Sequence, residues 1–380
     1  MLRIAVFTPT LESTILLSPI YIEISRSGHT ILFYDVVEES GWFEKGLQYI
    51  SLGYSKPRRV LRHITSDSLI NEVDRIISKD EPDIAVLAGY SPITLKLLNI
   101  LKRLGLKTIH VESGLRNYKE GYWEALRQAI DWSSRFNVLP SKRHYENLYS
   151  EGFPMEQMYI TGSLYVDSIL TNLSDAIKKS SILEELNLYR DRYIYSYISS
   201  DMAVEYSKYL GEASIKLDID IVLPLRRRVK DVLKDAELYY RLMTDYYVIA
   251  IEQIDYLDHI NLIYNSSAVI TDDPRVSLES AILKKDVYIL EESNDLYGLI
   301  DLGAAKPLSI NEDKILDLKW MGSKRDISPI FGGGESRFHV LDAIEGFSNA
   351  SYRDVEWRGL YLRKNGELII SDVKYNFEGV

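Results

Sequence analysis

The alternation of short apolar runs with helical patterns is the feature that most restricts how this chain can fold. Runs typical of β-strands recur from the first residues onward, at Leu2–Phe7, Thr30–Val37 and Asp83–Ala88. Between them apolar residues repeat at intervals of three and four, as from Leu69 to Val73, which predicts amphipathic helices. Strands that alternate with helices indicate parallel sheets joined by crossover helices.

The same rhythm continues through two halves of the chain. The first half has further predicted strands at Lys107–Val111, Phe136–Leu139 and Gln157–Ile160. After the polar stretch 175–181 the alternation restarts, with strands predicted at Arg192–Tyr197, Ile219–Leu223, Tyr246–Ala250, Ser267–Thr271 and Asp286–Leu290. A chain of 380 residues is longer than one hydrophobic core usually serves. We therefore predict an α/β protein with two Rossmann-like doubly wound domains, 1–174 and 182–347, facing a cleft where ligands bind at the strands' carboxyl ends.

The C-terminal segment carries a different signal. The pattern at 336–347 predicts a final helix, which is entered through three glycines, Gly332 to Gly334. Beyond it, Leu360–Arg363 and Glu367–Ile370 flank Asn365-Gly366, a dipeptide that favours a tight hairpin turn. Residues 351–380 are therefore predicted to form a β-hairpin extension.

Composition excludes several classes of function. The formal net charge is -11 and no basic run exceeds Arg226-Arg227-Arg228, so no nucleic-acid partner is expected. The absence of cysteine excludes disulfides, thiolate metal sites and a cysteine nucleophile, and is typical of the cytoplasm. No apolar run is long enough for a signal peptide or a membrane span, so no membrane partner is expected.

The most informative motif is Ile-His-Val-Glu-Ser-Gly-Leu-Arg at 109–116, which places Glu112 where a buried strand ends. A carboxylate at this edge of a parallel sheet projects toward the ligand and can transfer a proton. The alternative is structural: Glu112 caps a neighbouring helix or pairs with Arg116. The residues alone leave both interpretations open.

This motif and those that follow resemble the UDP-N-acetylglucosamine 2-epimerases. The family pattern His-Val-Glu-Ala-Gly-Leu-Arg, Ala-Pro-Thr, Glu-Asn-Leu and Thr-Gly-Asn-Thr-Val-Val-Asp is matched in order by His110 to Arg116, Pro140-Ser141, Glu146 to Leu148 and Thr161 to Asp167. The resemblance spans about residues 1 to 347. It implies a glycosyltransferase-B-like fold and a reaction, without cofactor or metal, that inverts C2 of UDP-N-acetylglucosamine by eliminating UDP and adding it back.

The resemblance also implies site residues and partners. Glu112 takes the position of a proton-transfer acid, and Arg116 and Ser163 lie in matched motifs as candidate substrate-binding residues. The expected partner is a UDP-sugar, and the expected assembly is a homodimer.

A second match lies at 268–280, where the resemblance places Glu279 on the acidic residue that holds the ribose hydroxyls of UDP. The family's Ser-Gly-Gly loop before it is here Asp272-Asp273-Pro274-Arg275, which offers fewer amides to a diphosphate. Asp273 as N-cap and Pro274 at the first helical position instead favour a stable helix start. Arg275 is a candidate replacement charge.

Other positions depart further from the family. Its Gly-Asp-Thr, whose Asp assists proton transfer, is Gly89-Tyr90-Ser91, and its Pro-Glu-Glu aligns with Tyr122-Trp123-Glu124, so that Glu124 is the candidate substitute acid. The histidine that faces phosphate in the family is absent at 198–202. Arg226, in the basic run, begins a helix or binds an anion.

The glycines before the last helix complete the candidate site. Gly332 to Ser336 resembles the family's Gly-Asp-Gly-x-Ala-Ser loop. With Gly333, Gly334 and Ser336 it predicts either an anion-binding nest or a plain hinge.

Three functions remain open at this point: a divergent epimerase, a catalytically degenerate nucleotide-sugar-binding or structural subunit, and a UDP-sugar hydrolase or glycosyltransferase.

Overall fold

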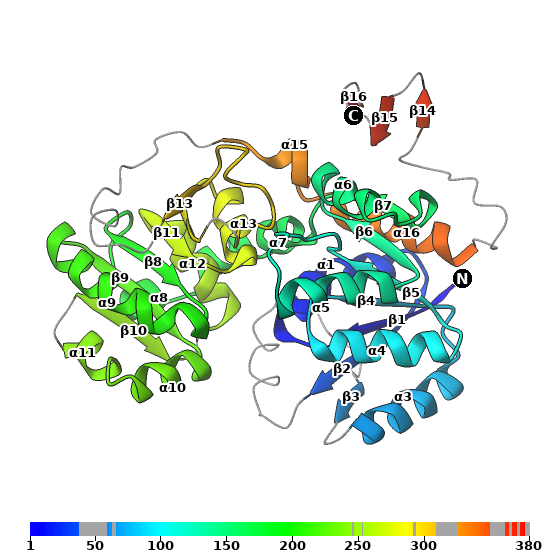
Figure 1. The fold of residues 1–380 in the computed structure, drawn as a ribbon, viewed down its shortest axis with the longest axis horizontal. Coiled ribbons are helices and arrows are strands. Elements are labelled where there is room, and N and C mark those ends of the chain that lie inside the picture. The colour runs from blue at the N-terminus through cyan, green and yellow to red at the C-terminus, as the bar shows by residue number, and fades with distance from the viewer. Residues whose placement is uncertain are drawn as a thin grey trace. The chain divides into compact units, whose positions relative to one another are not determined.

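The computed structural model of the chain describes residues 1–37, 59–62, 66–244, 247–252, 254–291, 294–308, 325–349, 362–364, 367–370 and 373–376. These residues form two compact units (Figure 1). The first comprises the described residues up to 168 together with those from 330 onward, and the second comprises the described residues of 169–329.

The first unit is built on a seven-stranded parallel sheet in the order β3-β2-β1-β4-β5-β6-β7. Its strands are β1 (Arg3–Thr8), β2 (Thr30–Val37), β3 (Arg59–Arg62), β4 (Ile84–Ala88), β5 (Lys107–Val111), β6 (Phe136–Leu139) and β7 (Met158–Ile160). Its helices are α1 (Leu11–Arg26), α3 (Ser66–Asp80), α4 (Pro92–Arg103), α5 (Tyr122–Ser133), α6 (Lys142–Ser150), the 3-10 helix Met155–Gln157, the start of α7 (Leu164–Lys179), the end of α15 (Ser328–Phe331) and α16 (Ser336–Asn349).

The second unit repeats this plan with six parallel strands in the order β10-β9-β8-β11-β12-β13. Its strands are β8 (Tyr193–Tyr197), β9 (Asp220–Leu225), β10 (Val248–Glu252), β11 (Ala268–Thr271), β12 (Asp286–Leu290) and β13 (Lys306–Leu308). Its helices are α8 (Ile182–Glu185), α9 (Ser200–Leu217), α10 (Arg227–Asp235), α11 (Tyr239–Thr244), α12 (Tyr256–Asn265) and α13 (Pro274–Ile282).

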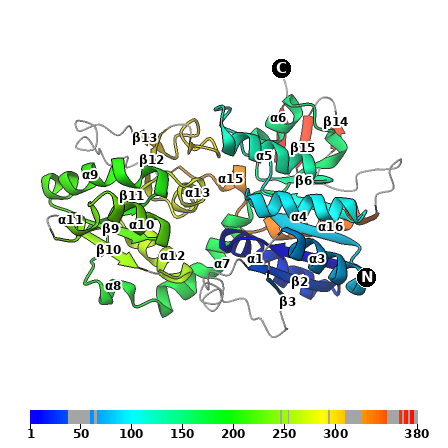
Figure 2. The same cartoon turned by 60° about the horizontal axis from the view of Figure 1, so that its bottom comes forward.

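Both sheets are doubly wound, which confirms the predicted fold class of two Rossmann-like α/β domains. In each sheet the first strand in sequence, β1 or β8, lies beside the fourth, β4 or β11, and the strand order reverses there. Helices cover both faces of each sheet (Figure 2). Ligands of such sheets bind where the order reverses, outside the carboxyl ends of the strands, so the loops that follow these strands are the expected ligand site.

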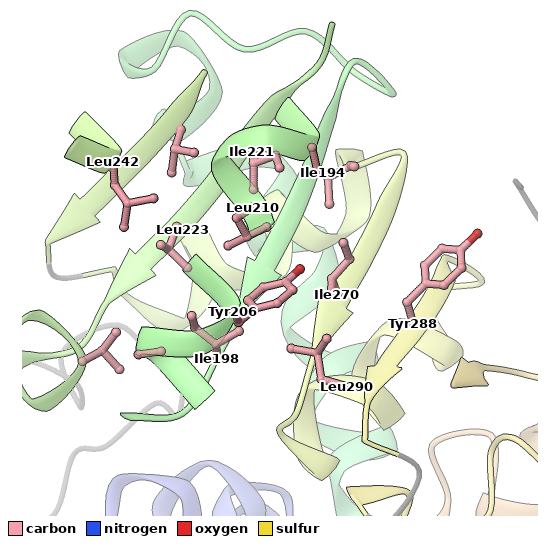
Figure 3. Close-up of a cluster of buried hydrophobic side chains, with 14 of the residues drawn as sticks. Ile194, Ile198, Tyr206, Leu210, Ile221, Leu223, Leu242, Ile270, Tyr288 and Leu290 are labelled. Atoms are coloured by element: carbon pink, nitrogen blue, oxygen red, sulfur yellow. The ribbon is translucent and has the colours of Figure 1, made fainter. Parts of the chain in front are cut away.

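The core of the second unit shows why its strands are nearly continuous apolar runs. Tyr206 and Leu210 of α9 pack onto one face of the sheet, against buried side chains such as Ile194, Leu223 and Ile270 (Figure 3). Helices α8, α12 and α13 cover the other face. Strands covered on both faces bury alternate side chains in both directions.

Most predicted strands match the observed bounds within one or two residues. Strands β3 and β13 were not expected, because Arg59–Arg62 is too short and too charged, and Lys306–Leu308 contains a proline, which suits the sheet edge that it occupies. The predicted strand at Tyr246–Ala250 is β10, and Tyr246 lies outside the described residues.

The last helix belongs to the first unit, although the predicted domain 182–347 includes it. Helix α16 packs against α1. Phe347 stacks on Phe136 at 4.0 Å between ring centroids, and Glu345 Oε1 lies 2.7 Å from His29 Nε2. The alternation of strands and helices in the sequence assigns each helix to the same domain as the strands before it. It therefore gives no sign that the last helix packs on the first unit.

Beyond α16 the described residues form a three-stranded antiparallel sheet, β14 (Leu362–Lys364), β15 (Glu367–Ile370) and β16 (Val373–Asn376). Strands β14 and β15 pair with Lys364 opposite Glu367, as a hairpin around 365–366 requires. Asn365 and Gly366 themselves lie outside the described residues. Strand β16 adds a pairing that we did not predict.

Candidate active site

Glu112 is the first residue after β5, and its backbone has a φ of +63°. This left-handed conformation is uncommon for a residue with a side chain, and such strain gathers at functional sites. Only 3% of Glu112 is exposed. Its Oε1 accepts a hydrogen bond of 2.5 Å from the hydroxyl of Ser163, which begins the turn into α7. Glu112 is therefore a buried carboxylate held at the carboxyl edge of the sheet.

Asp131 of α5 is the centre of a buried network behind this turn. Its Oδ1 lies 2.8 Å from His110 Nδ1, and its Oδ2 accepts from the Gly114 amide at 3.1 Å and from Arg116 Nη1 at 2.8 Å. The Tyr90 hydroxyl lies 3.1 Å from each oxygen. Asp131 thus ties together β5, the loop after β4 and the loop that carries Glu112.

The charges in this network fix the direction of its hydrogen bonds. Burial alone would raise the pKa of Asp131, but the hydrogen bond from His110 and the charge of Arg116 outweigh it, and the pKa lies below its usual value. Burial and the Asp131 charge raise the pKa of Tyr90 well above its usual value. Tyr90 is therefore a protonated donor to an ionised carboxylate, and His110 Nδ1 must donate as well.

The guanidinium of Arg116 binds other groups of the protein and is not directed toward a ligand. Its Nε and Nη2 donate to the two oxygens of Glu151 at 2.7 and 3.0 Å, and its Nη1 donates to Asp131 and to the Leu115 carbonyl. Its side chain is fully buried. The candidate substrate-binding role of Arg116 is not favoured, because a guanidinium committed to these carboxylates cannot turn toward a ligand without leaving buried charges unpaired.

Ser163 and Glu124 also hold the protein itself. Besides binding Glu112, the Ser163 oxygen accepts from the Tyr165 amide, and it is fully buried. Glu124 accepts from Arg127 Nη2 at 2.6 Å and from the amides of Asn117 and Tyr118 at 3.3 Å. Its carboxylate clamps the loop before α5, which is a simpler account of its burial than the substitute acid predicted from sequence.

Two carboxylates of the chain, Glu335 beside the glycines and Asp167 of α7, bind the loop before α16. The Gly333 amide donates to Glu335 Oε2 at 2.8 Å, and Asp167 accepts from the amides of Ser336 and Arg337. Gly334 has a φ of +106°, and its carbonyl accepts a hydrogen bond from Arg337 Nη1. Of the two predictions for this loop, the internal capping by Asp167 and Glu335 favours the structural one.

In the second unit, Glu279 lies in a buried cluster. Tyr256 donates to its Oε1 at 3.0 Å, while Arg275 Nη1 and His259 Nε2 lie 2.8 and 3.0 Å from its Oε2. His259 Nδ1 in turn lies 2.7 Å from the Tyr195 hydroxyl. Glu279 is fully buried, so the expected contact between its carboxylate and a ribose is not prepared in this structure.

Two arginines meet at the carboxyl end of the central strand β8. The guanidinium of Arg226 lies 4.7 Å from the centroid of the Tyr197 ring, and that of Arg275 lies 5.6 Å from it. Arg226 also donates to the carbonyl of Ile198 and occupies the N-cap position of α10, which confirms that the basic run begins a helix. Two cations on one aromatic ring beside the reversal of strand order form a candidate anion site.

The start of α13 is as predicted from sequence. Asp273 is the N-cap, its side chain accepts from the amides of Arg275 and Val276, and Pro274 is the first helical residue. Asp272 accepts from the amide and hydroxyl of Ser199. The Asp273 carboxylate thus occupies the first amides of α13, which leaves fewer amides for an anion.

Sequence reasoning missed Asp131, His259 and Tyr197. Asp131 has no strand-end position or motif and looks like one polar residue of an amphipathic helix. His259 and Tyr197 lie 20 and 82 residues from Glu279 along the chain. The available signal was the position of Tyr197 at the end of a predicted strand, the same criterion that identified Glu112.

Within the described residues, no group of three His, Cys, Asp or Glu side chains could hold a metal ion. In the same part of the chain, none of the helices has the length and apolar character needed to cross a membrane.

Comparison with known proteins places this chain in a family. The family model described as UDP-N-acetylglucosamine 2-epimerase matches residues 40–344. The UDP-N-acetylglucosamine 2-epimerase of Methanococcus maripaludis is 23% identical over 290 residues, which cover 73% of this chain and 79% of that one. That of Methanocaldococcus jannaschii is 24% identical over 285 residues, which cover 72% and 78%.

A solved structure has the same fold. The crystal structure of the Methanocaldococcus jannaschii UDP-GlcNAc 2-epimerase in complex with UDP-GlcNAc and UDP matches with a TM-score of 0.80 and 22% identity. The match covers 90% of this chain and 99% of that one. The glycosyltransferase-B-like fold expected from the resemblance is thereby confirmed.

Proposed function

Since the chain belongs to the UDP-N-acetylglucosamine 2-epimerase family, we propose that it binds a UDP-sugar and inverts C2 of the sugar, with Glu112 as the residue that moves the proton. The observation that carries the proposal is the Glu112 carboxylate itself. It lies at the carboxyl edge of the sheet, with a strained backbone and a fixed hydrogen bond from Ser163.

The reaction needs no external oxidant or cofactor. A base takes the proton from C2 while the bond from C1 to the UDP oxygen breaks, which gives a glycal and UDP. Return of UDP to C1 and of a proton to the opposite face of C2 gives the epimer. A positioned carboxylate contributes about 10²–10⁴-fold to such a proton transfer.

Arg226 is the proposed contact to the diphosphate, and Arg275, whose Nη1 binds the Glu279 carboxylate, adds positive charge beside it. Because Asp273 occupies the first amides of α13, the charge that stabilises departing UDP has to come from side chains. The two guanidinium groups beside Tyr197 supply it at the edge of the sheet where ligands bind.

A second candidate is a catalytically degenerate nucleotide-sugar binder. Tyr90 stands where the family has an acid and donates to Asp131, while Glu279 is fully buried. A tyrosine at position 90 and the burial of Glu279 each remove a function expected from the family, and neither disrupts the fold. A UDP-sugar hydrolase or glycosyltransferase needs only one carboxylate base and stays a third possibility.

One experiment separates these functions. We would incubate UDP-N-acetylglucosamine in deuterated water with wild type and with Glu112→Gln, and follow C2 by NMR. Deuterium at C2 and the manno epimer with wild type alone support the epimerase. UDP release without an epimer supports the hydrolase, and UDP binding without exchange supports the binder.

We also propose a homodimer in the cytoplasm, on the grounds of the family resemblance and the absence of cysteine. The molecular mass from light scattering tests the dimer, and fractionation of the source cells tests the location.

A further inference from the structure

Three aromatic residues in the loop after Glu112 and at the start of the helix that it enters are exposed. They are Tyr118 in the loop before α5 and Tyr122 and Trp123 in its first turn, with exposed fractions of 60%, 62% and 53%. The rings of Tyr122 and Trp123 meet edge to face at 5.2 Å between centroids. We call these three residues the aromatic surface.

The aromatic surface is built into the loop that carries Glu112. The Tyr118 hydroxyl donates to Asn147 Oδ1 at 2.9 Å, and Asn147 Nδ2 donates to the Gly114 carbonyl at 2.8 Å. Gly114 is two residues after Glu112. Two hydrogen bonds therefore connect the aromatic surface to the turn that holds the carboxylate.

Holding this loop in place requires a strained backbone and a buried ion pair. Tyr118 has a φ of +55°, a strained conformation for a residue with a large side chain. The buried carboxylate of Glu124 binds the amides of Asn117 and Tyr118 and is itself held by Arg127. Burying this ion pair to fix a surface loop indicates that the position of the loop matters.

The aromatic surface lies on the ligand side of the sheet. Helix α5 leads from the carboxyl end of β5 back to the start of β6, and Asp131 on it contacts His110 of β5. Trp123 is eight residues earlier on the helix, which is about 12 Å along its axis. The first turn of α5 therefore extends toward and past the carboxyl ends of the strands.

We propose that the aromatic surface binds the pyranose ring of the nucleotide sugar, with Trp123 as the main contact. A pyranose presents a face of C–H groups edged by hydroxyls, and Trp and Tyr combine an apolar ring with a polar tip. The aromatic surface comes immediately after the loop residues that hold Glu112, the proposed proton-transfer residue. This inference rests on the proposed function and adds the residues that select the sugar.

Calorimetry with the full chain tests the inference, with UDP and UDP-N-acetylglucosamine as ligands. Trp123→Ala is expected to weaken UDP-N-acetylglucosamine about tenfold and UDP less than twofold, because UDP lacks the pyranose. Trp123→Phe keeps a ring and should restore most of the affinity. Trp132→Ala is the matched control, since Trp132 is 46% exposed on the same helix but at its other end.

The outcomes are distinct. Unchanged affinity for UDP-N-acetylglucosamine in Trp123→Ala, or an equal loss for both ligands, overturns the inference while leaving the proposed function intact. A fall in molecular mass by light scattering with unchanged affinity assigns the aromatic surface to a second copy of the chain and overturns it as well. A wild type that binds neither ligand overturns the proposed function and this inference together.

Discussion

The Tyr90 hydroxyl lies 3.1 Å from both oxygens of the Asp131 carboxylate. The resemblance implies an acid at the position of Tyr90 in the family, and a second carboxylate turned toward Asp131 in the same buried place would repel it. Tyrosine instead reaches across as a donor and also accepts from the Leu115 amide at 3.2 Å. Tyr90 thus adds a further link to the network that holds the Glu112 turn.

Asp131→Asn should strongly destabilise the protein. Its carboxylate compensates the charge of Arg116 and binds His110 by a hydrogen bond, and all three side chains are fully buried. Removing one member of a buried ion pair costs about 3–5 kcal/mol, because the other charge stays behind. Urea unfolding followed by circular dichroism measures the change. Asp175→Asn, which breaks the exposed pair with Lys179, is the control and should cost less than about 1 kcal/mol; equal losses would contradict the central role of Asp131.

His259 should make the stability depend on pH below neutrality. Burial lowers the pKa of His259, and the opposing hydrogen bond to Glu279 does not outweigh it. The unfolded chain then binds more protons than the folded chain between the ordinary value of about 6.5 and the lower folded pKa. Stability is therefore fully present above about pH 6.5 and falls as the pH drops toward the folded pKa.

The measurement compares wild type with His259→Gln in urea at pH 7.0 and pH 5.5. Wild type should lose more stability than the variant over this interval, since glutamine does not titrate. Parallel losses in the two proteins would show that other groups cause the pH dependence.

The sequence predicted those features that depend on neighbouring residues. The position of Glu112 follows from a strand end, and the Asp273 cap follows from the order of four residues at a helix start. Both are local, and both are found where they were expected. The strand-helix rhythm is local as well, and it was enough to predict two doubly wound domains.

The partners of these residues depend on contacts between distant segments. Ser163 reaches Glu112 across 51 residues, and Tyr90 reaches Asp131 across 41. No periodicity encodes such pairs. Glu279 shows the same limit, because its donors Tyr256 and His259 come from α12 and turn a candidate ligand contact into a buried cluster.

Gly162→Ala should lower the free energy of unfolding by more than the positive φ of Gly162 alone explains. Gly162 has a φ of +84°, and an added Cβ would lie 2.4 Å from Ser336 Oγ and 2.7 Å from the Phe331 carbonyl oxygen. Gly28 is a matched control, with a φ of +81° and open space around it. Gly28→Ala should cost about 1–2 kcal/mol, and Gly162→Ala about 1–3 kcal/mol more because of overpacking. Urea unfolding of both variants tests this, and similar values would show that the contact with the α16 loop relaxes easily.

Ser163→Ala should slow the reaction without unfolding the protein. The Ser163 hydroxyl orients the Glu112 carboxylate, and losing one charge-assisted hydrogen bond of about 1.5–3 kcal/mol corresponds to a fall of about 10–100-fold in kcat. KM should change little, because Ser163 is buried behind the carboxylate. The measurement is the rate of C2 deuterium exchange over a range of substrate concentrations, which gives kcat and KM separately. A rise in KM at constant kcat would instead mean that Ser163 contacts the substrate.

Arg226→Met should weaken the binding of UDP and leave uridine unaffected. The guanidinium lies over Tyr197, at the edge of the second sheet where an anionic ligand is expected, and methionine keeps much of the stem while removing the charge. Losing one charge-assisted contact to a phosphate corresponds to about a tenfold loss in affinity.

The matched control is Arg227→Met, because Arg227 is the next residue in the chain but its side chain is 72% exposed. Calorimetry at two salt concentrations completes the test, since the wild-type affinity for UDP should fall with salt more steeply than that of Arg226→Met. If Arg227→Met weakens UDP as much as Arg226→Met does, the basic run attracts the nucleotide by its overall charge and the site beside Tyr197 has no special role.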